Sequence, residues 1–288
     1  HNLSREMLPT ESLDKREVWE ALLDKMPMTA MIRNLGNMSK CGLLAPMSDA
    51  SRTVCERLRN IDLIKKARVH PIAVLVAMKT YGGGKGMRGS GQWTTVQQVV
   101  DALDDAFYLS FGNVEPTGKR ILFGLDVAAS MNAPAGGNLP ITCCEGASAM
   151  AMVCARSERE YHIMAFDQGI RDLRISPRMR LDDVLRLTQN INGGGTDCAL
   201  PMIWAEKQRV SCDAFVVITD NETWAGRIHP KQALRSYRDK MGVPGAKQVI
   251  MAMTPTHFSI ADPNDPLTMD VVGFDTATPQ VISEFIKV

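Results

Sequence analysis

Apolar residues in the first part of the chain recur at helical spacing. Val96, Val99, Val100, Leu103 and Phe107 stand at intervals that place their side chains on one face of a helix. Val54 and Leu58 begin a similar face earlier in the chain. Pro71 stands where a first helical residue is expected, ahead of an apolar run. The pattern therefore predicts several amphipathic helices packed on one another.

Start and stop signals give these helices their expected limits. Asp14 with Glu17 has the pattern of a capping box and predicts a helix that runs to about Lys25. A second helix is expected over 29–35, with Gly36 as its stop. Three glycines at 82–84 end the helix that Pro71 begins. We predict that residues 1–112 form an all-helical domain.

The pattern changes after residues 112–119, which have no period and are typical of a linker. Short apolar runs then alternate with helical segments, as in a doubly wound parallel sheet. The expected strands are 121–125, 161–166, 214–219, 248–253 and 270–274. The expected helices are 144–156, 181–189, 201–207, 230–240 and 279–287. Residues 119–288 are therefore predicted to form an α/β domain.

Oxygen-bearing side chains gather at the loops of this predicted sheet. Asp126 and Ser130 follow the first strand, Thr196 precedes a helix, and Asp220 follows the third strand. Ligands of doubly wound sheets bind beyond the carboxyl ends of the strands, at a switch in strand order. Hydroxyl and carboxylate oxygens without His or Cys favour a hard cation such as Mg²⁺ over zinc. The alternative is that the four residues cap strand ends without a metal.

A cation held in this way suits recognition better than catalysis. If the carboxylates hold the ion through water, its charge is incompletely compensated, and it accepts a carboxylate or phosphate of a partner as a further ligand. The sequence shows neither a second carboxylate cluster for a two-metal mechanism nor an oriented base and nucleophile. A hydrolase or nuclease is therefore the weakest hypothesis, and we expect no enzyme.

Composition narrows the class of protein. The seven cysteines are an odd number without Cys-x-x-Cys spacing, which predicts neither a disulfide framework nor a zinc site and favours a reducing compartment. The longest apolar stretch, 146–155, is about half of the roughly 20 residues that a membrane span needs. We expect a cytoplasmic protein, with the nucleus as an alternative location, and no membrane partner.

Positive charge is concentrated in the helical part, although the net charge of the chain is only +1. Residues 52–88 contain nine basic side chains and two acidic ones. This excess predicts a positively charged face, for which the plain alternative is an ordinary solvated surface. The segment Gly82–Gly86 resembles a phosphate loop, but Gly86 follows Lys85 where a Ser or Thr belongs, and no strand precedes it. We interpret it as a flexible basic loop.

Longer motifs carry a resemblance to known families. The loops with Asp126, Thr196 and Asp220 resemble the metal-site loops of von Willebrand A domains. Beyond these, the chain resembles the Ro autoantigen, or TROVE-domain, family of RNA-binding proteins through nearly its entire length. The stretches that carry this resemblance are Lys66–Pro71, Val114–Arg120, Gly194–Cys198 with Leu200–Ala205, Thr219–Thr223, Ile260–Pro263 and Gly273–Thr276.

The resemblance implies a fold and a function. Members of this family have a ring of HEAT-like helical repeats closed by a von Willebrand A domain. The family implies binding of small noncoding Y RNAs on the outer ring surface and of the single-stranded ends of misfolded RNAs in the central hole, in RNA quality control. The basic residues expected to contact RNA are Lys65, Lys66, Arg68, His70, Lys85 and Arg88. For His70, a role as a helix-entry residue bound to backbone is an equal alternative.

Two departures from the family pattern limit what it implies. The chain matches only the later part of that pattern, so we expect most of the helical ring to lie outside this sequence. The family's metal motif is Asp-x-Ser-x-Ser, whereas position 128 is alanine. One direct ligand is therefore missing, and we expect a site that either holds Mg²⁺ more weakly or holds none. The second functional hypothesis is a protein-interaction module whose metal captures a carboxylate of a protein partner.

Overall fold

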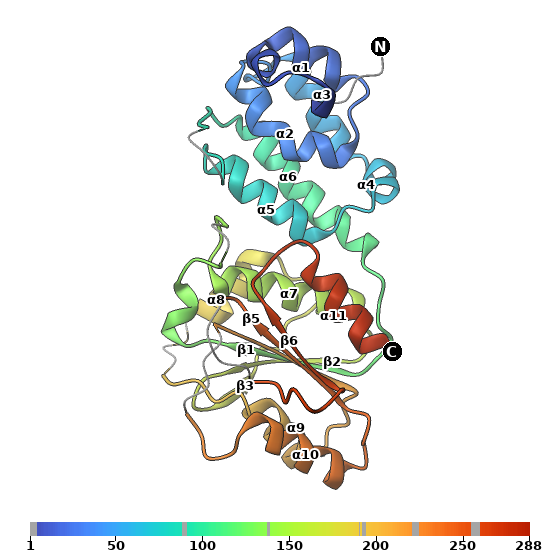
Figure 1. Cartoon of the computed structure of the whole chain (residues 1–288), viewed down its shortest axis with the longest axis vertical. Helices are drawn as coiled ribbons and strands as arrows, with labels where there is room; N and C mark the ends of the chain where they lie inside the picture. The colour runs from blue at the N-terminus through green and yellow to red at the C-terminus, as the bar shows by residue number, and fades with distance from the viewer. Residues whose placement is uncertain are drawn as a thin grey trace. The chain divides into compact units, whose positions relative to one another are not determined.

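The computed structural model describes residues 5–87, 91–136, 139–189, 191, 194–220, 225–254 and 260–288. These form two compact units (Figure 1). The first extends to Val114, and the second comprises most of the chain from Glu115 to Val288. The predicted linker at 112–119 lies around this division.

The first unit is built from helices, as the periodicity predicts. Two short 3-10 turns, Arg5–Met7 and Thr10–Asp14, precede the first α-helix, and a third, Phe111–Asn113, follows the last. The α-helices are α1 (Arg16–Leu23), α2 (Met28–Lys40), α3 (Asp49–Arg59), α4 (Ile61–Ala67), α5 (Pro71–Gly82) and α6 (Gln97–Ser110).

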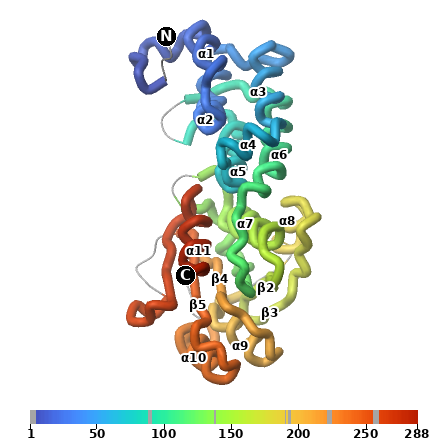
Figure 2. Tube along the Cα trace, turned by 90° about the vertical axis from the view of Figure 1, so that its right-hand side faces the viewer, coloured from blue at the N-terminus to red at the C-terminus, as the bar shows by residue number. Residues whose placement is uncertain are grey.

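Helix α6 is the centre of this unit. It packs against α3, α4 and α5, and Figure 2 shows α3, α4 and α5 along it. Val99, Leu103 and Phe107 of its predicted stripe are fully buried. Removal of this apolar surface from water is the main favourable contribution to folding of the unit. The predicted helical face is confirmed at these positions.

Two expected helix limits are wrong. Helix α2 continues through Gly36 to Lys40. Gly36 is therefore an interior residue of the helix, and its missing side chain makes room for the ring of Trp93. A Cβ at Gly36 would lie 2.6 Å from the ring of Trp93. The predicted capping box at Asp14 is absent: α1 begins at Arg16 after Lys15, without a side-chain cap, and the Asp14 carboxylate accepts from Lys40 instead, at 3.0 Å.

The second unit contains one six-stranded sheet. Its strands are β1 (Ile121–Asp126), β2 (Tyr161–Phe166), β3 (Ile170–Asp172), β4 (Ala214–Thr219), β5 (Lys247–Ala252) and β6 (Thr268–Val272). Their order is β3-β2-β1-β4-β5-β6, and every neighbouring pair is parallel except β2 with β3. The five predicted strands are present with small shifts at their ends, whereas the three-residue β3 was not predicted.

Helices cover both faces of the sheet, which confirms the doubly wound α/β architecture. Figure 1 shows α7 (Cys143–Ser157), α8 (Leu181–Gln189) and α11 (Thr278–Lys287) on one face. Helices α9 (Leu200–Gln208) and α10 (Pro230–Met241) lie on the other. Strands β1 and β4 are buried along their whole length because both faces are covered.

The strand order reverses between β1 and β4. The chain leaves β1 for β2 on one side and later returns to β4 on the other, so these neighbouring parallel strands end at the same edge of the sheet. A crevice at such a switch point is the usual ligand position in this architecture. The sheet therefore brings together the loops that begin at Asp126 and Asp220.

Candidate functional site

Asp126 is the centre of the cluster at the switch point. It is the last residue of β1, and its side chain is nearly fully buried. Its Oδ1 accepts from the backbone N–H of Ala128 at 2.9 Å. Its Oδ2 accepts from the hydroxyls of Thr196 at 3.2 Å and Thr219 at 2.8 Å. One carboxylate therefore joins the ends of β1 and β4 to the loop that carries Thr196.

Burial raises the pKa of Asp126 to about 6, and the negative charge of Asp220 adds to this increase. The hydrogen bonds from Ala128, Thr219 and Thr196 act in the opposite direction, because they favour the charged carboxylate. The carboxylate of Asp220 thus lies near enough to oppose ionisation of the buried Asp126. This arrangement favours a bound cation at the same place.

The other predicted ligands are placed differently. Asp220 is half-buried and follows Thr219, whose hydroxyl lies 3.4 Å from its Oδ1. Ser130 is exposed in the 3-10 turn Ala129–Asn132, and within the described part of the chain its side chain makes no hydrogen bond. The structure thus joins Asp126, Thr196 and Asp220 in one network and leaves Ser130 outside that network.

Two residues of the cluster were not among the predicted ligands. Thr219 links the two carboxylates, and its position next to Asp220 was the only sequence signal for it. Asp197 is buried, accepts from the backbone N–H of Ala199 at 3.0 Å and donates its own N–H to the carbonyl of Asp167. It fixes the loop that carries Thr196, and burial raises its pKa.

The donor chemistry of the cluster fits a hard cation. The predicted ligand side chains all offer oxygen atoms, and two of them are carboxylates. The described residues hold no cluster of three or more His, Cys, Asp or Glu. Ala128 is buried and presents only a methyl group. One ligand position would therefore be left to water, which fits a weakly held ion.

The predicted basic residues lie in the helical unit. Lys65 and Lys66 occupy the last turn of α4, and Arg68 follows as its left-handed C-cap with φ 49°. All three side chains are exposed and form no ion pair with a described residue. Lys85 is also exposed, in a turn where its backbone bridges to Gln92. Arg88 lies outside the described residues.

Several basic residues nearby have structural partners. Arg57 donates to the carbonyl oxygens of Leu23 and Met26 and so anchors the end of α1. Arg59 pairs with Asp105 at 2.7 Å, and Arg52 pairs with Asp49 at 3.2 Å. The free positive charge is therefore concentrated on Lys65, Lys66 and Arg68, which we call the α4 basic cluster.

His70 has the geometry of a helix-entry residue. Its Nδ1 accepts from the backbone N–H of Ile72 at 3.2 Å, and Pro71 occupies the first turn of α5. Burial lowers the pKa of His70 to about 4, so the imidazole is neutral at pH 7. The backbone-bound role is present in the structure, and contact with RNA stays a prediction.

The two units thus define a helical-repeat segment with a basic cluster and a von Willebrand A-type α/β domain with a polar switch-point cluster. The family model described as Ro60 vWA domain matches residues 120–286, and the model described as TROVE domain matches residues 2–80. The chain therefore belongs to the Ro family.

Similar proteins support this family membership. RNA-binding protein RO60 of Caenorhabditis elegans is 41% identical, over 99% of this chain and 44% of that protein. RNA-binding protein RO60 of Deinococcus radiodurans is 42% identical, over the whole of this chain and 54% of that protein. The crystal structure of the Deinococcus radiodurans RO (RSR) protein has a TM-score of 0.93 at 42% identity and covers 99% of this chain and 57% of that one. The chain therefore spans about half the length of these relatives.

None of the helices in the described residues is long and apolar enough to cross a membrane.

Proposed function

We propose that this chain binds RNA through its helical unit, with the α4 basic cluster as the main contact. The observation that carries this proposal is the exposure of Lys65, Lys66 and Arg68 without carboxylate partners, in a chain of the Ro family. Cations left free in this way attract the phosphate backbone, which supplies most of the affinity of such proteins.

Membership of the Ro family supports the class of RNA that we propose. Small noncoding Y RNA and the single-stranded ends of misfolded RNA are the proposed ligands, in RNA quality control in the cytoplasm or nucleus. Recognition of RNA favours single strands and loops, where phosphates and unstacked bases are accessible together. The proposed role is binding, without a catalytic step. His70 and Lys85 are proposed as further contacts, and Arg88 is proposed from the sequence alone.

The test is binding of a structured RNA with a single-stranded 3′ tail, measured by fluorescence anisotropy across a salt series. We expect binding that weakens steeply with salt and does not change with chelator. Charge reversal of Lys65, Lys66 and Arg68 to glutamate should abolish most of the affinity. It should also lower the slope of log affinity against log salt by about 2, because each contact to a single strand contributes about 0.7.

A matched control separates a local effect from a general effect of charge. Reversal of Arg178, Lys207 and Lys231, three exposed basic residues of the α/β unit, changes the net charge by the same amount. This control should bind RNA nearly as well as the unchanged chain. Full affinity after reversal of the α4 basic cluster, or equal loss in the control, contradicts the proposal.

A second function is favoured by the polar cluster at the switch point. We propose that Asp126, Thr196 and Asp220, with Ser130 through water, hold Mg²⁺ weakly and that the ion binds a carboxylate of a protein partner. The bound ion would supply an open coordination position. The network centred on Asp126 supports this proposal, because it aligns oxygen donors from three loops.

Isothermal titration with Mg²⁺ tests the cation site directly. We expect a small heat of binding for the unchanged chain and tighter binding by Ala128→Ser, which adds the hydroxyl of the family motif. Heat for Ala128→Ser alone would mean that this chain has lost the metal-dependent function. No heat for either protein would contradict the site itself. These titrations do not test RNA binding, because we expect chelator to leave RNA affinity unchanged.

A further inference from the structure

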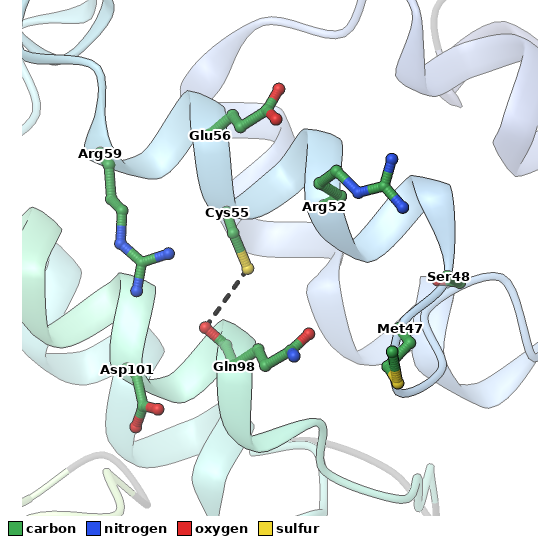
Figure 3. A pocket seen from close by; sticks show the side chains of 8 residues that line it. All are labelled: Met47, Ser48, Arg52, Cys55, Glu56, Arg59, Gln98 and Asp101. Carbon is green, nitrogen blue, oxygen red and sulfur yellow. Dashed lines mark hydrogen bonds between the residues drawn. The ribbon is translucent and has the colours of Figure 1, made fainter.

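The helical unit contains a polar pocket that the basic cluster does not include. It has a volume of about 460 Å³ and lies between α3, α6 and the turn before α3. This volume is in the range of small-ligand sites. Figure 3 shows the lining side chains around Cys55, with Arg59 and Asp101 on one side and Arg52 and Met47 on the other. The other lining residues are Ser48, Glu56 and Gln98.

The floor of the pocket is fixed by buried contacts. Cys55 is nearly fully buried, and its thiol donates to the backbone carbonyl of Gln98 at 3.3 Å, which joins α3 to α6. Its short side chain leaves space above it. Ser48 accepts from the backbone N–H of Ser51 at 3.1 Å and so caps α3. The pocket is therefore held in place by two helices and a capped turn.

Met47 forms an unusual part of the rim. Its side chain is 83% exposed, and its φ of 62° is in the left-handed region that residues other than glycine rarely adopt. Neighbouring bonds hold this turn, since the hydroxyl of Ser51 donates to the carbonyl of Ala45 at 2.8 Å. Methionine is a polarisable side chain that packs well on aromatic faces. An exposed methionine in a constrained turn is suited to stack on a flat ligand.

The charged groups around the pocket form a complementary set. Glu56 makes no hydrogen bond or ion pair with a described residue, and Asp101 uses one oxygen to accept from Gln97 at 2.8 Å. Arg52 and Arg59 each pair with one carboxylate outside the pocket and keep other N–H groups. A ligand for this pocket therefore needs N–H donors for the carboxylates and acceptor oxygens for the guanidinium groups.

We infer that the pocket binds an unpaired guanine base of a single-stranded RNA. Guanine offers two parallel N–H donors to a carboxylate on one edge and the acceptors O6 and N7 to an arginine on the other. Adenine and the pyrimidines lack the paired donors, and a ring nitrogen of adenine would face the carboxylate with its lone pair. Met47 would stack on the base. This inference rests on the proposed RNA binding and names the base that such an RNA presents.

The test compares bases in an otherwise constant strand. A short, labelled uridine tract carries one central guanosine, adenosine or inosine, and its affinity for the whole chain is measured by anisotropy. Guanosine should bind about tenfold more tightly than adenosine, the discrimination expected of one bidentate pair. Inosine, which lacks the exocyclic amino group, should fall between the two. Equal affinities for guanosine and adenosine overturn the inference.

Variants locate the preference. Glu56→Gln with Asp101→Asn should remove the preference for guanosine and leave the affinity for the adenosine strand nearly unchanged, because both carboxylates are on the surface and neither meets the phosphates. The matched control is Glu20→Gln with Asp239→Asn, two exposed carboxylates outside the pocket. It should keep the preference. A preference that survives in the pocket variant would contradict the assignment.

A second measurement separates this inference from the proposed function. Saturation-transfer NMR with GMP, and with AMP as the comparison, detects base binding without a polynucleotide. A saturation-transfer signal from the base proton H8 of GMP with the unchanged chain, and no such signal with the pocket variant, supports base binding in the pocket. This result would hold even if no long RNA binds. Binding of the adenosine strand without any GMP signal or guanosine preference supports RNA binding and rejects the pocket.

Discussion

The two candidate sites differ in how the fold holds their polar groups. Asp126 is buried and accepts three hydrogen bonds, from its own loop, from the loop with Thr196 and from the end of β4. Lys65, Lys66 and Arg68, in contrast, are exposed and have no partner in the described residues. In the first site, side-chain positions are set before any ligand arrives. In the second, long flexible side chains can adapt to a ligand of variable shape.

This difference has consequences for substitutions. Exposed residues without partners contribute little to stability, so replacing the α4 basic cluster should change binding and leave folding intact. Residues around the switch-point cluster are joined by hydrogen bonds, so substitutions there should alter the stability of the α/β unit and cation binding together. We expect the largest effect where backbone strain and overlap act on the switch-point cluster.

Gly226→Ala should damage the switch-point cluster most. Gly226 has φ 89°, and a Cβ there would lie 2.2 Å from Oδ2 of Asp197. Asp197 cannot turn away easily, because its Oδ1 accepts from Ala199. Backbone strain and overlap together should lower the free energy of unfolding of the α/β unit by about 4 kcal/mol. Urea denaturation measures it, and Gly245→Ala, with open space around the added carbon, should change it little.

His70 should make the helical unit sensitive to acid. Its pKa is about 4 in the folded chain because of burial, below the 6.5 of an exposed histidine. The folded state therefore binds fewer protons, so the stabilisation is present above pH 6.5 and is lost as the pH falls toward 4. The loss should approach about 3 kcal/mol. Amide exchange in α5 at pH 7 and pH 4.5 measures it.

His70→Asn separates the capping role from the titration. Asparagine is a good N-cap and does not titrate, so the variant should keep the amide protection of α5 at pH 7 and lose its acid sensitivity. Unchanged acid sensitivity in this variant would show that another group is responsible. RNA affinity of the same variant tests the predicted contact, since the imidazole is removed while the helix start is kept.

Gly36→Ala should destabilise the helical unit by about 2 kcal/mol. The added carbon would lie 2.6 Å from the Trp93 ring, which is held by a 3.0 Å bond from its Nε1 to the carbonyl of Tyr81 and by stacking on the Tyr81 ring. Gly82→Ala is the control, because nothing lies near its added carbon, and alanine is the better helix former. Thermal denaturation of both variants measures the difference. Equal stability would mean that the Trp93 ring moves freely.

The sequence predicts much of the fold, because local patterns determine much of it. Apolar runs bounded by turn residues give the five longer strands, and helical periodicity gives α8 over 181–189. The errors occur where a residue far along the chain determines the local structure. Gly36 was predicted to end a helix, but it lies inside the helix and makes room for the ring of Trp93. Asp14 was predicted to cap a helix, but its carboxylate binds Lys40. The strand β3 has only three residues, too few for a period to be visible.

The candidate sites were predicted to different degrees for the same reason. Asp126, Thr196 and Asp220 lie at strand ends or loops whose positions follow from the topology, so their meeting could be expected. Which cations remain free depends on partners far along the chain, such as Asp105 for Arg59. The pocket around Cys55 joins residues 47–59 to residues 98–101 across two helices, and no local pattern indicates it.

Gln248 gives the smallest expected effect and a sign opposite to the others. It is fully buried in β5, its amide Nε2 contacts only the sulfur of Met202 at 3.6 Å, and its Oε1 has no hydrogen-bond partner in the described structure. Asp126 is also buried and polar, but three donors meet it. Replacing an unsatisfied group by an apolar one of similar shape removes a desolvation penalty, so Gln248→Met should stabilise the α/β unit by about 1 kcal/mol.

The midpoint of urea denaturation measures this gain, and Gln248→Ala provides the comparison. Alanine also removes the unsatisfied oxygen but leaves a cavity, so it should destabilise the unit by about 2 kcal/mol. If Gln248→Met destabilises as well, the amide oxygen has a partner such as a buried water. If it stabilises, burial of Gln248 leaves its amide oxygen unsatisfied, whereas the carboxylate of Asp126 is satisfied by three donors.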